Sequence, residues 1–274
     1  MDSTRITFIG CGNMGHSLIG GLIADGYDSS LLCGADIDRK KCDALSEKFN
    51  IKSTVNNEQA IHTADVIVLA VKPQAIRETL ATINEGLLNK QRLLISVAAG
   101  IRLKDLLSWT HTNQSIVRTM PNTPALVQTG ATALCANQFT SDEQRNIAEA
   151  IMRAVGLTVW LNDEELLDVV TALSGSGPAY FFLVMEAMEK AATGLGLPVE
   201  QARLLTLQTA FGAAKMALES KYDPAILRQH VTSPGGTTEK AINVLLEGDF
   251  EKIFREAMKS AMQRSRELAD QFGE

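Results

Sequence analysis

ITFIGCGNMG, residues 6–15, is the stretch that decides the fold. An apolar strand, Ile6 to Ile9, runs directly into three glycines, Gly10, Gly12 and Gly15, which have GxGxxG spacing. In this motif the first glycine allows a sharp turn, the second lets a pyrophosphate approach the backbone, and the third lets the next helix lie close to the strand. An amphipathic helix follows and ends at Gly26. This context predicts a dinucleotide-binding turn, although the motif alone also fits a tight strand-to-helix turn.

A second strand, SLLCGAD at residues 30–36, ends at Asp36. An acidic residue at about this distance from the glycines usually holds the adenosine ribose. Arg39, Lys40 and Lys41 follow immediately and could instead bind a 2′-phosphate, or form a solvated helix face. These residues by themselves leave the choice between NADPH and NADH open.

Further strands are expected at residues 64–71 and 92–100, as continuous apolar runs typical of parallel strands covered on both faces. A strand beginning at residue 115 and two more, at 131–137 and 156–163, continue the sheet. In an open parallel sheet the ligand lies at the carboxyl ends of the strands. The turns that follow these strands should therefore surround a cofactor, and they contain Lys72, Pro73, Ala98, Pro121 and Asn122.

Strand patterns end at Asp163, so we expect a dinucleotide-binding domain over residues 1–163 and a helical domain over 164–274. The predicted helices cover residues 164–173, 178–194, 198–220, 224–231, 238–247 and 250–272. Helices 178–194 and 198–220 are apolar around most of their circumference, which a small isolated bundle could not bury. The pattern indicates a second subunit that covers them, the alternative being a monomeric bundle in which they are central.

Two glycine-rich segments interrupt this helical half, SGSGPAY at residues 174–180 and SPGGTTEKA at 233–241. Both place small residues directly before a helix, where backbone N–H groups and hydroxyls converge and could receive an anion. A carboxylate is the anion that we expect. Each segment alone could equally be a turn between helices with a serine cap.

Composition and charge favour a small-molecule enzyme. The chain has 274 residues, 45% of them hydrophobic, with a net charge of −6, and no basic block suggests a nucleic acid or membrane partner. Four cysteines without a CxxC pair and four scattered histidines predict no metal site and a reduced, cytoplasmic protein. No apolar run was expected to be long enough to span a bilayer.

The segments FIGCGNMG, AVKPQ, SVAAG, RTMPNTPALV, SGSGPAY and VTSPGGTTEKAI together resemble the pyrroline-5-carboxylate reductase family over essentially the whole chain. The SPGGTT segment is the most family-specific of them. The resemblance implies an α/β fold, with an N-terminal Rossmann-type doubly wound sheet followed by an all-helical C-terminal dimerisation domain. It also implies reduction of L-1-pyrroline-5-carboxylate to L-proline, the last step of proline biosynthesis. The cofactor would be NADPH or NADH, and the assembly a homodimer that often builds decamers.

The resemblance also assigns roles to residues. The reaction passes a hydride to the imine carbon while the nitrogen carries or acquires a proton, so no basic residue has to deprotonate an alcohol. Thr238 would lie beside the ring nitrogen as the catalytic residue. The substrate would be bound by Ser176, Ser233, Gly235, Gly236, Thr237 and Thr238. The cofactor would be bound by Gly10, Gly12, Asn13, Met14, Gly15, Asp36, Arg39, Asn56, Ala70, Lys72, Pro73, Ala98, Pro121 and Asn122.

The same sequence features separate this function from two others. A β-hydroxyacid dehydrogenase has a lysine four residues after the second glycine of a GxG, and an asparagine four further on. Counted from Gly177, these places hold Phe181 and Met185, so the lysine that alcohol oxidation requires is missing. A non-catalytic nucleotide sensor would retain the glycine motif and lose the carboxylate loop, whereas SPGGTT is complete here.

Overall fold

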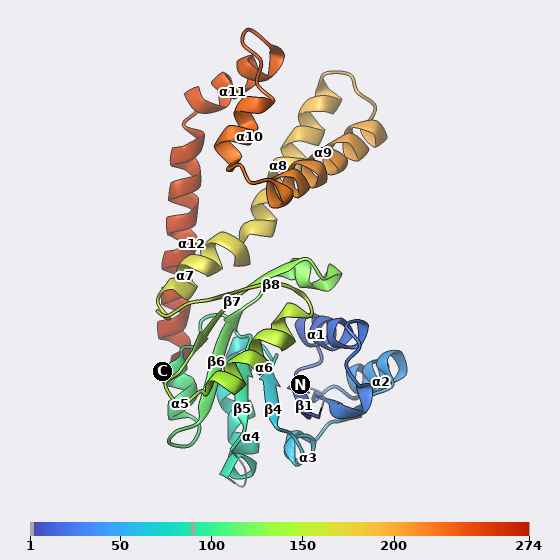
Figure 1. The fold of residues 1–274 in the computed structure, drawn as a ribbon, viewed down its shortest axis with the longest axis vertical. Coiled ribbons are helices and arrows are strands. Elements are labelled where there is room, and N and C mark those ends of the chain that lie inside the picture. Colours follow the sequence, from blue (N-terminus) through green and yellow to red (C-terminus); the bar gives the residue numbers. More distant parts are fainter. Residues whose placement is uncertain (1–2, 89–90, 274) are drawn as a thin grey trace. The chain divides into compact units, whose positions relative to one another are not determined.

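The structure, a computed structural model, describes residues 3–88 and 91–273. Contacts between residues divide the chain into two compact units (Figure 1). The first, which we call the nucleotide unit, comprises Met1–Ser176 with Ser260–Glu274, and the second, the helical unit, comprises Gly177–Lys259. The first unit therefore contains two separate parts of the sequence, whereas the strand pattern predicted one division after residue 163.

The nucleotide unit is built on an eight-stranded sheet with the order β3-β2-β1-β4-β5-β6-β7-β8. The first six strands are parallel and have the 3-2-1-4-5-6 order of doubly wound dinucleotide-binding folds. β7 runs antiparallel to β6 and pairs in parallel with β8. The strands are β1 (Ile6–Ile9), β2 (Leu32–Ala35), β3 (Lys52–Thr54), β4 (Val66–Leu69), β5 (Leu93–Ser96), β6 (Ser115–Met120), β7 (Gly130–Ala136) and β8 (Gly156–Trp160).

Helices cover both faces of this sheet, which explains the continuous apolar runs of the central strands. One core contains residues of α1 (Asn13–Ala24), α2 (Arg39–Phe49) and α6 (Asp142–Arg153). The core on the opposite face contains residues of α3 (Asn57–Ile61), α4 (Ile76–Leu88) and α5 (Leu103–Ser108). Alternate residues of β4 enter the two cores, so all four of its side chains are buried.

Two segments from the helical half of the sequence belong to the nucleotide unit. They are α7 (Leu166–Val170), with the π-helical turn Thr171–Gly175 that follows it, and the last part of α12 (Phe250–Gly273). The hydroxyl of Ser265 on α12 donates to Oδ1 of Asp168 on α7 at 2.7 Å, and both residues are buried. Arg266 lies 3.7 Å from the other carboxylate oxygen. This buried contact explains why the units divide after residue 176 and not after residue 163.

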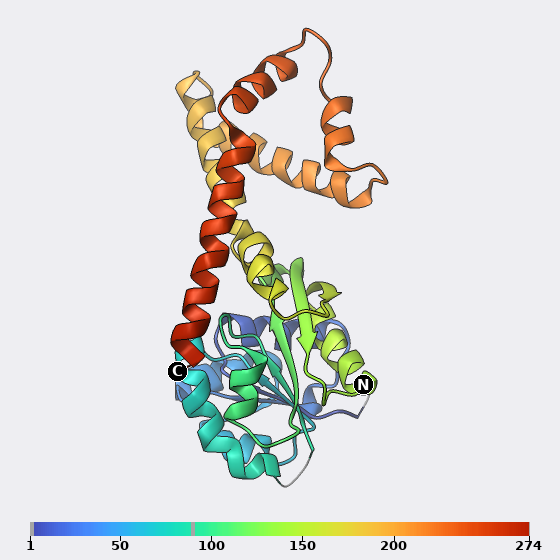
Figure 2. The same ribbon diagram turned by 90° about the vertical axis from the view of Figure 1, so that its left-hand side faces the viewer.

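The helical unit contains α8 (Gly177–Gly194), α9 (Val199–Glu219), α10 (Pro224–His230), α11 (Thr237–Glu247) and the first part of α12, which is one uninterrupted helix (Figure 2). Each lies within two residues of its predicted bounds. The unit has little core of its own, since only Gly177, Ala202 and Thr206 are buried among its described residues. Its exposed apolar side chains include Phe181, Phe182, Leu183, Leu204, Leu205, Phe211, Val244 and Leu245.

One helical stretch, Leu166–Gly194, is long and apolar enough to cross a membrane by length and composition, with a window hydropathy of 1.3. The expectation that no stretch would be long enough is not met, because this helix is interrupted by glycines and serines and has no unbroken apolar run in the sequence. An apolar helix that another subunit covers has the same length and composition.

The Asp168 contact yields a stability prediction. Ser265→Ala removes the hydroxyl donor from a buried carboxylate, so we expect the free energy of unfolding to fall by about 1–3 kcal/mol. Ser260→Ala on the exposed face of the same helix is the matched control and should leave stability unchanged. Thermal unfolding of both variants makes the comparison, and equal melting temperatures would show that the buried bond contributes nothing.

Candidate active site

A cavity of about 410 Å³ lies at the carboxyl ends of β1, β2 and β4 in the nucleotide unit. This is the point where the strand order reverses between β1 and β4, and ligands of doubly wound sheets bind there. Its lining includes Gly10 and Gly12 after β1, Asp36 and Lys41 after β2, Asn57, and Ala70, Val71 and Lys72 after β4.

The three glycines of the first turn are required for different structural reasons. Gly10 has a φ of +102°, and a Cβ there would lie 2.5 Å from the carbonyl carbon of Ala70. A Cβ at Gly15 would lie 2.2 Å from the carbonyl oxygen of Gly10. At Gly12 a Cβ would meet nothing within 4 Å. Gly10 and Gly15 are therefore required by packing, whereas Gly12 leaves open space beside the cavity that a pyrophosphate would fill.

The N-terminus of α1 suits an anion. Gly12 is its N-cap residue and provides no side chain to accept a hydrogen bond from the first turn. The N–H groups of that turn are therefore available, and they carry the positive end of the helix dipole. The residues present thus fit the pyrophosphate of a dinucleotide cofactor.

Asp36 is fixed at the edge of the cavity with 9% of its surface exposed. Its Oδ2 accepts a hydrogen bond from the N–H of Cys11 at 2.9 Å, inside the glycine turn, and its Oδ1 accepts one from the N–H of Asp38 at 3.0 Å. The Nζ of Lys41 lies 3.6 Å from Oδ2. The site therefore holds an acceptor for a ribose hydroxyl and a cation for a phosphate next to each other.

The cysteines near the site are unreactive. Cys11 lies within the glycine turn, and burial raises the pKa of its thiol to about 12, with smaller contributions from Cys42 and Asp36. The thiol is therefore protonated at physiological pH and is a poor nucleophile or metal ligand. Cys11, Cys33, Cys42 and Cys135 are all free, and the described residues contain no cluster of metal-binding side chains.

Asn122 joins two parts of the nucleotide unit. Its Nδ2 donates to the carbonyl of Ser174 at 3.0 Å, and its Oδ1 accepts from the N–H of Ala131 at 2.9 Å. Four residues after Ser174 stands Pro178, which has no N–H to continue the helix hydrogen bonds. The Asn122 amide therefore satisfies a carbonyl that the proline leaves unpaired, and it positions the SGSG segment beside the turn after β6.

In the helical unit, the segment 233–238 forms a turn directly before α11. Gly235 has a φ of +72° and donates its N–H to Oε2 of Glu239 at 2.8 Å. Gly236 is the N-cap residue of α11 and offers no side chain to the first-turn N–H groups. No hydrogen bond occupies the hydroxyls of Ser233, Thr237 and Thr238 in the described structure. The turn therefore presents free hydroxyls and N–H groups, which is what a carboxylate requires.

Thr238 does not cap α11. Because Gly236 is the N-cap residue, Thr238 is the second residue of the helix, and its hydroxyl makes no capping hydrogen bond to the first turn.

Comparison with known proteins identifies the family. Residues 164–268 match the family model for pyrroline-5-carboxylate reductase dimerisation, and residues 5–100 match that for NADP oxidoreductase, coenzyme F420-dependent. The pyrroline-5-carboxylate reductase of Pseudomonas aeruginosa is 47% identical over the full length of both chains. The chain belongs to the pyrroline-5-carboxylate reductase family.

Solved structures of the family agree with this assignment. The pyrroline-5-carboxylate reductase from Coxiella burnetii is 46% identical with a TM-score of 0.94, over 97% of this chain and 99% of that one. The enzyme of Plasmodium falciparum, solved with NADP bound, is 28% identical with a TM-score of 0.86, over 98% and 99% of the two chains. The expected family and the expected fold class are confirmed.

The structure brings five of the predicted cofactor residues of this reductase together. Gly10, Gly12, Asp36, Ala70 and Lys72 all line the 410 Å³ cavity. The first turn of α1, beside this cavity, contains Asn13, Met14 and Gly15. Four other predicted cofactor residues follow β4, β5 and β6 but do not line this cavity: Pro73, Ala98, Pro121 and Asn122. Ser176, predicted to bind the substrate, is the C-cap residue of the π-helical turn, and its side chain has no partner among the described residues.

Two predicted residues have near neighbours that line the cavity in their place. Arg39 is exposed at the start of α2, whereas Lys41 lines the cavity and pairs with Asp36. Asn56 caps α3 by accepting the N–H of Gln59 at 3.0 Å, and Asn57 is the residue that lines the cavity. The position of the helix cap decides which of the neighbouring residues faces the cavity. The sequence showed that basic residues follow Asp36, but it did not show which of them would point inward.

The glycine geometry predicts opposite behaviour for two substitutions. Gly12→Ala should leave thermal stability unchanged but weaken binding of the reduced dinucleotide, because its methyl group enters the open space over the turn. Gly15→Ala should lower the melting temperature, because its methyl group would collide with the Gly10 carbonyl. Thermal unfolding and fluorescence titration with NADPH separate the two effects. A Gly12→Ala protein that binds cofactor normally would contradict the assignment of this space.

Proposed function

We propose that this chain reduces the ring imine of L-1-pyrroline-5-carboxylate to L-proline with NADPH or NADH. The observation that carries the proposal is the turn 233–238, in which the hydroxyls of Ser233, Thr237 and Thr238 and the first-turn N–H groups of α11 all lack partners among residues 3–88 and 91–273. Membership of the reductase family supports the same activity.

The residues of this turn supply binding and orientation. The N–H groups at the start of α11 and the hydroxyls of Ser233 and Thr237 would hold the substrate carboxylate, with Gly235 and Gly236 shaping the turn. The Thr238 hydroxyl would lie beside the ring nitrogen and stabilise its changing charge. The reduced nicotinamide supplies the hydride when bound. Because the substrate is an imine, the site needs no base to deprotonate an alcohol, and orientation is its main task.

For the cofactor, the glycine turn would hold the pyrophosphate, with Asp36 and Lys41 at the adenosine ribose, and Lys72 also lines the cavity. Asp36 favours a free 2′-hydroxyl, while Lys41, together with the exposed Arg39 and Lys40, favours a 2′-phosphate. We propose that both cofactors work, with a modest preference for NADPH. The related Plasmodium falciparum structure has NADP bound, which supports this choice.

The assembly that we propose is a homodimer through the helical unit, with a decamer as its larger form. The exposed apolar side chains of α8, α9 and α11 support a partner, as does the match to the dimerisation family model. We also propose a cytoplasmic enzyme without a nucleic acid or membrane partner, on the basis of its acidic charge and free cysteines.

The two other functions have less support. This chain has Phe181 where a β-hydroxyacid dehydrogenase has its lysine, and its family is that of the pyrroline-5-carboxylate reductases. The nucleotide sensor predicts cofactor binding without turnover, which an activity assay distinguishes directly.

The first test of the function is steady-state kinetics. The wild-type chain should oxidise NADPH and NADH in the presence of L-1-pyrroline-5-carboxylate, with the higher kcat/KM for NADPH. The triple substitution Arg39→Ala, Lys40→Ala, Lys41→Ala should raise the KM for NADPH about tenfold and leave that for NADH nearly unchanged, because only a 2′-phosphate needs the cations. Binding of cofactor without turnover would identify a sensor, and an equal loss for both cofactors would reduce the basic residues to a helix surface.

Thr238 provides the second test. Its hydroxyl has no partner in the part of the chain that the structure describes, so Thr238→Ala should leave the melting temperature unchanged. If the hydroxyl stabilises charge at the ring nitrogen, kcat should fall by about one to two orders of magnitude, and Thr238→Ser should restore most of it. A Thr238→Ala enzyme with full kcat would assign proton delivery to water or to a substrate that is already protonated.

A further inference from the structure

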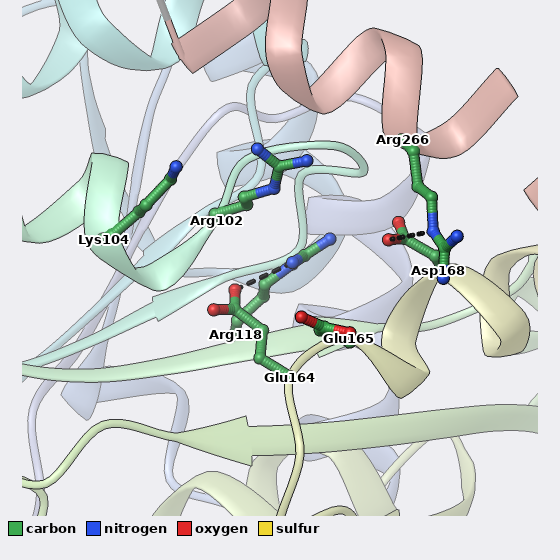
Figure 3. Close-up of a pocket in the computed structure, with 7 residues that line it drawn as sticks. All are labelled: Arg102, Lys104, Arg118, Glu164, Glu165, Asp168 and Arg266. Atoms are coloured by element: carbon green, nitrogen blue, oxygen red, sulfur yellow. Dashed lines mark hydrogen bonds and ion pairs between the residues drawn. The ribbon is translucent and has the colours of Figure 1, made fainter. Parts of the chain in front are cut away.

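A second cavity of the nucleotide unit is separate from the proposed reaction site. It has a volume of about 540 Å³ and shares no lining residue with the dinucleotide cavity. Its seven lining residues come from four segments, the start of α5, β6, α7 with the residues before it, and the last part of α12. All seven are charged: Arg102, Lys104, Arg118, Glu164, Glu165, Asp168 and Arg266 (Figure 3).

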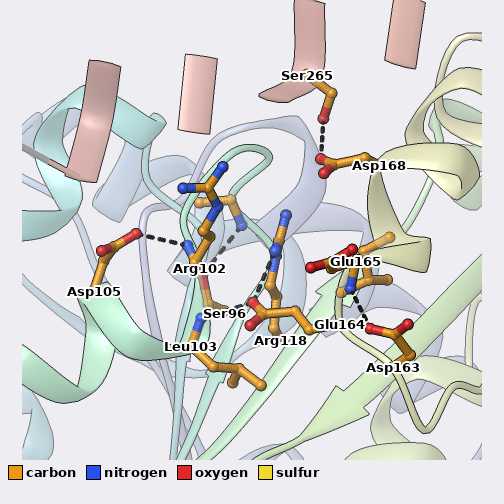
Figure 4. A network of polar contacts seen from close by, with 12 residues as sticks. Ser96, Arg102, Leu103, Asp105, Arg118, Asp163, Glu164, Glu165, Asp168 and Ser265 are labelled. Atoms are coloured by element: carbon orange, nitrogen blue, oxygen red, sulfur yellow. Dashed lines mark hydrogen bonds and ion pairs between the residues drawn. The ribbon is translucent and has the colours of Figure 1, made fainter. Parts of the chain in front are cut away.

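Contacts within the protein use only part of this charge (Figure 4). Glu164 Oε1 accepts hydrogen bonds from Nη1 of Arg118 at 2.8 Å and from the N–H of Leu103 at 2.7 Å. Arg266 pairs with Asp168 at 3.7 Å. Arg102 pairs at 2.7 Å with Asp270, which lies outside the lining.

Three groups retain binding capacity after these contacts. Lys104 and the Glu165 carboxylate have no hydrogen-bond or ion-pair partner among residues 3–88 and 91–273. The side chain of Arg118 is only 5% exposed, yet only one of its five guanidinium N–H groups donates a hydrogen bond to another described residue. In the described structure, Asn84 Oδ1 is the only fully buried side-chain nitrogen or oxygen without a hydrogen-bond partner. The remaining guanidinium nitrogens of Arg118 have no partner, so they are not fully buried. They therefore face the cavity.

The arrangement of the charges defines the ligand. In Figure 3 the guanidinium groups of Arg102 and Arg118 approach the same space, with the Glu165 carboxylate beside it. Guanidinium groups bind carboxylates through paired hydrogen bonds, and a carboxylate between two of them relieves their repulsion. Once Arg118 is paired with Glu164, Arg266 with Asp168 and Arg102 with Asp270, Lys104 and Glu165 remain as one unpaired charge of each sign beside the free N–H groups of Arg118. The complement of the cavity therefore carries charges of both signs.

We propose that this cavity binds an acidic α-amino acid, a molecule with two carboxylates and one ammonium group. One carboxylate binds Arg118 and Arg102, the other binds Lys104, and the ammonium group binds Glu165. The cavity is large enough to admit a ligand of this size. The site is distinct from the turn 233–238, which is proposed to hold the substrate, and it does not depend on the reductase activity.

L-glutamate and glutarate test the proposal as a matched pair, because they share two carboxylates and a chain length and differ in the ammonium group. Calorimetric titration of the intact protein should show one L-glutamate per chain and binding of glutarate weaker by about tenfold, the difference expected of one charge-assisted hydrogen bond. Equal affinities would overturn the ammonium site at Glu165, and no binding of L-glutamate would overturn the whole proposal.

Substitutions locate the binding. Glu165→Gln should weaken L-glutamate about tenfold without weakening glutarate, whereas Lys104→Gln should weaken both. Both residues are exposed, so the variants should fold, and a melting curve checks this. Glu143→Gln, an equal charge change in the first turn of α6, should have no effect. If Glu143→Gln weakens L-glutamate as much as Glu165→Gln does, the binding reflects net charge and the proposal is wrong.

The reaction site is excluded by two further measurements. Thr238→Ala should bind L-glutamate as the wild type does, and Glu165→Gln should reduce pyrroline-5-carboxylate with an unchanged kcat. Loss of L-glutamate binding in Thr238→Ala, with retention in Glu165→Gln, would place the ligand at the turn 233–238 and overturn the proposal. This result would be independent of whether the chain proves to be a reductase.

Discussion

The close approach of the Gly10 backbone to Ala70 is the constraint on which the site depends. β1 and β4 are neighbours in the sheet, and their following turns meet where no side chain fits on Gly10. The same turn brings the carbonyl of Gly10 against Gly15, which fixes where α1 begins. Asp36 then binds the turn through the N–H of Cys11. A cavity lined by the glycine turn before α1 and by the Asp36 carboxylate follows from these contacts.

The helical unit follows a different principle. Its helices are well formed, but almost none of their side chains are buried within the chain, and α8, α9 and α11 expose phenylalanine, leucine and valine. The turn 233–238 stands directly before α11, one of these exposed helices. Burial of apolar surface is the main stabilising contribution to folding, and the exposed apolar faces of this unit agree with its match to the dimerisation family model. The proposed substrate turn and the exposed apolar surface thus share α11.

The sequence predicted most of the fold because its patterns are local. Strand β1 with its glycines, the apolar strand β4 and the helices after Pro178, Pro198 and Pro224 all lie near their expected places. β3 was missed, since Lys52–Thr54 is a short, polar edge strand without an apolar run. The cavity contacts of Lys41 and Asn57 depend on helical phase, and the charged cavity around Arg118 joins segments distant in sequence. No local pattern encodes such contacts.

The buried bond between Asp168 and Ser265 joins residues separated by 97 positions, and the whole helical unit lies between them in the sequence. During synthesis on the ribosome, residues 177–259 must therefore emerge before the nucleotide unit can close this contact. Folding of the nucleotide unit is therefore complete only after the whole helical unit has been synthesised.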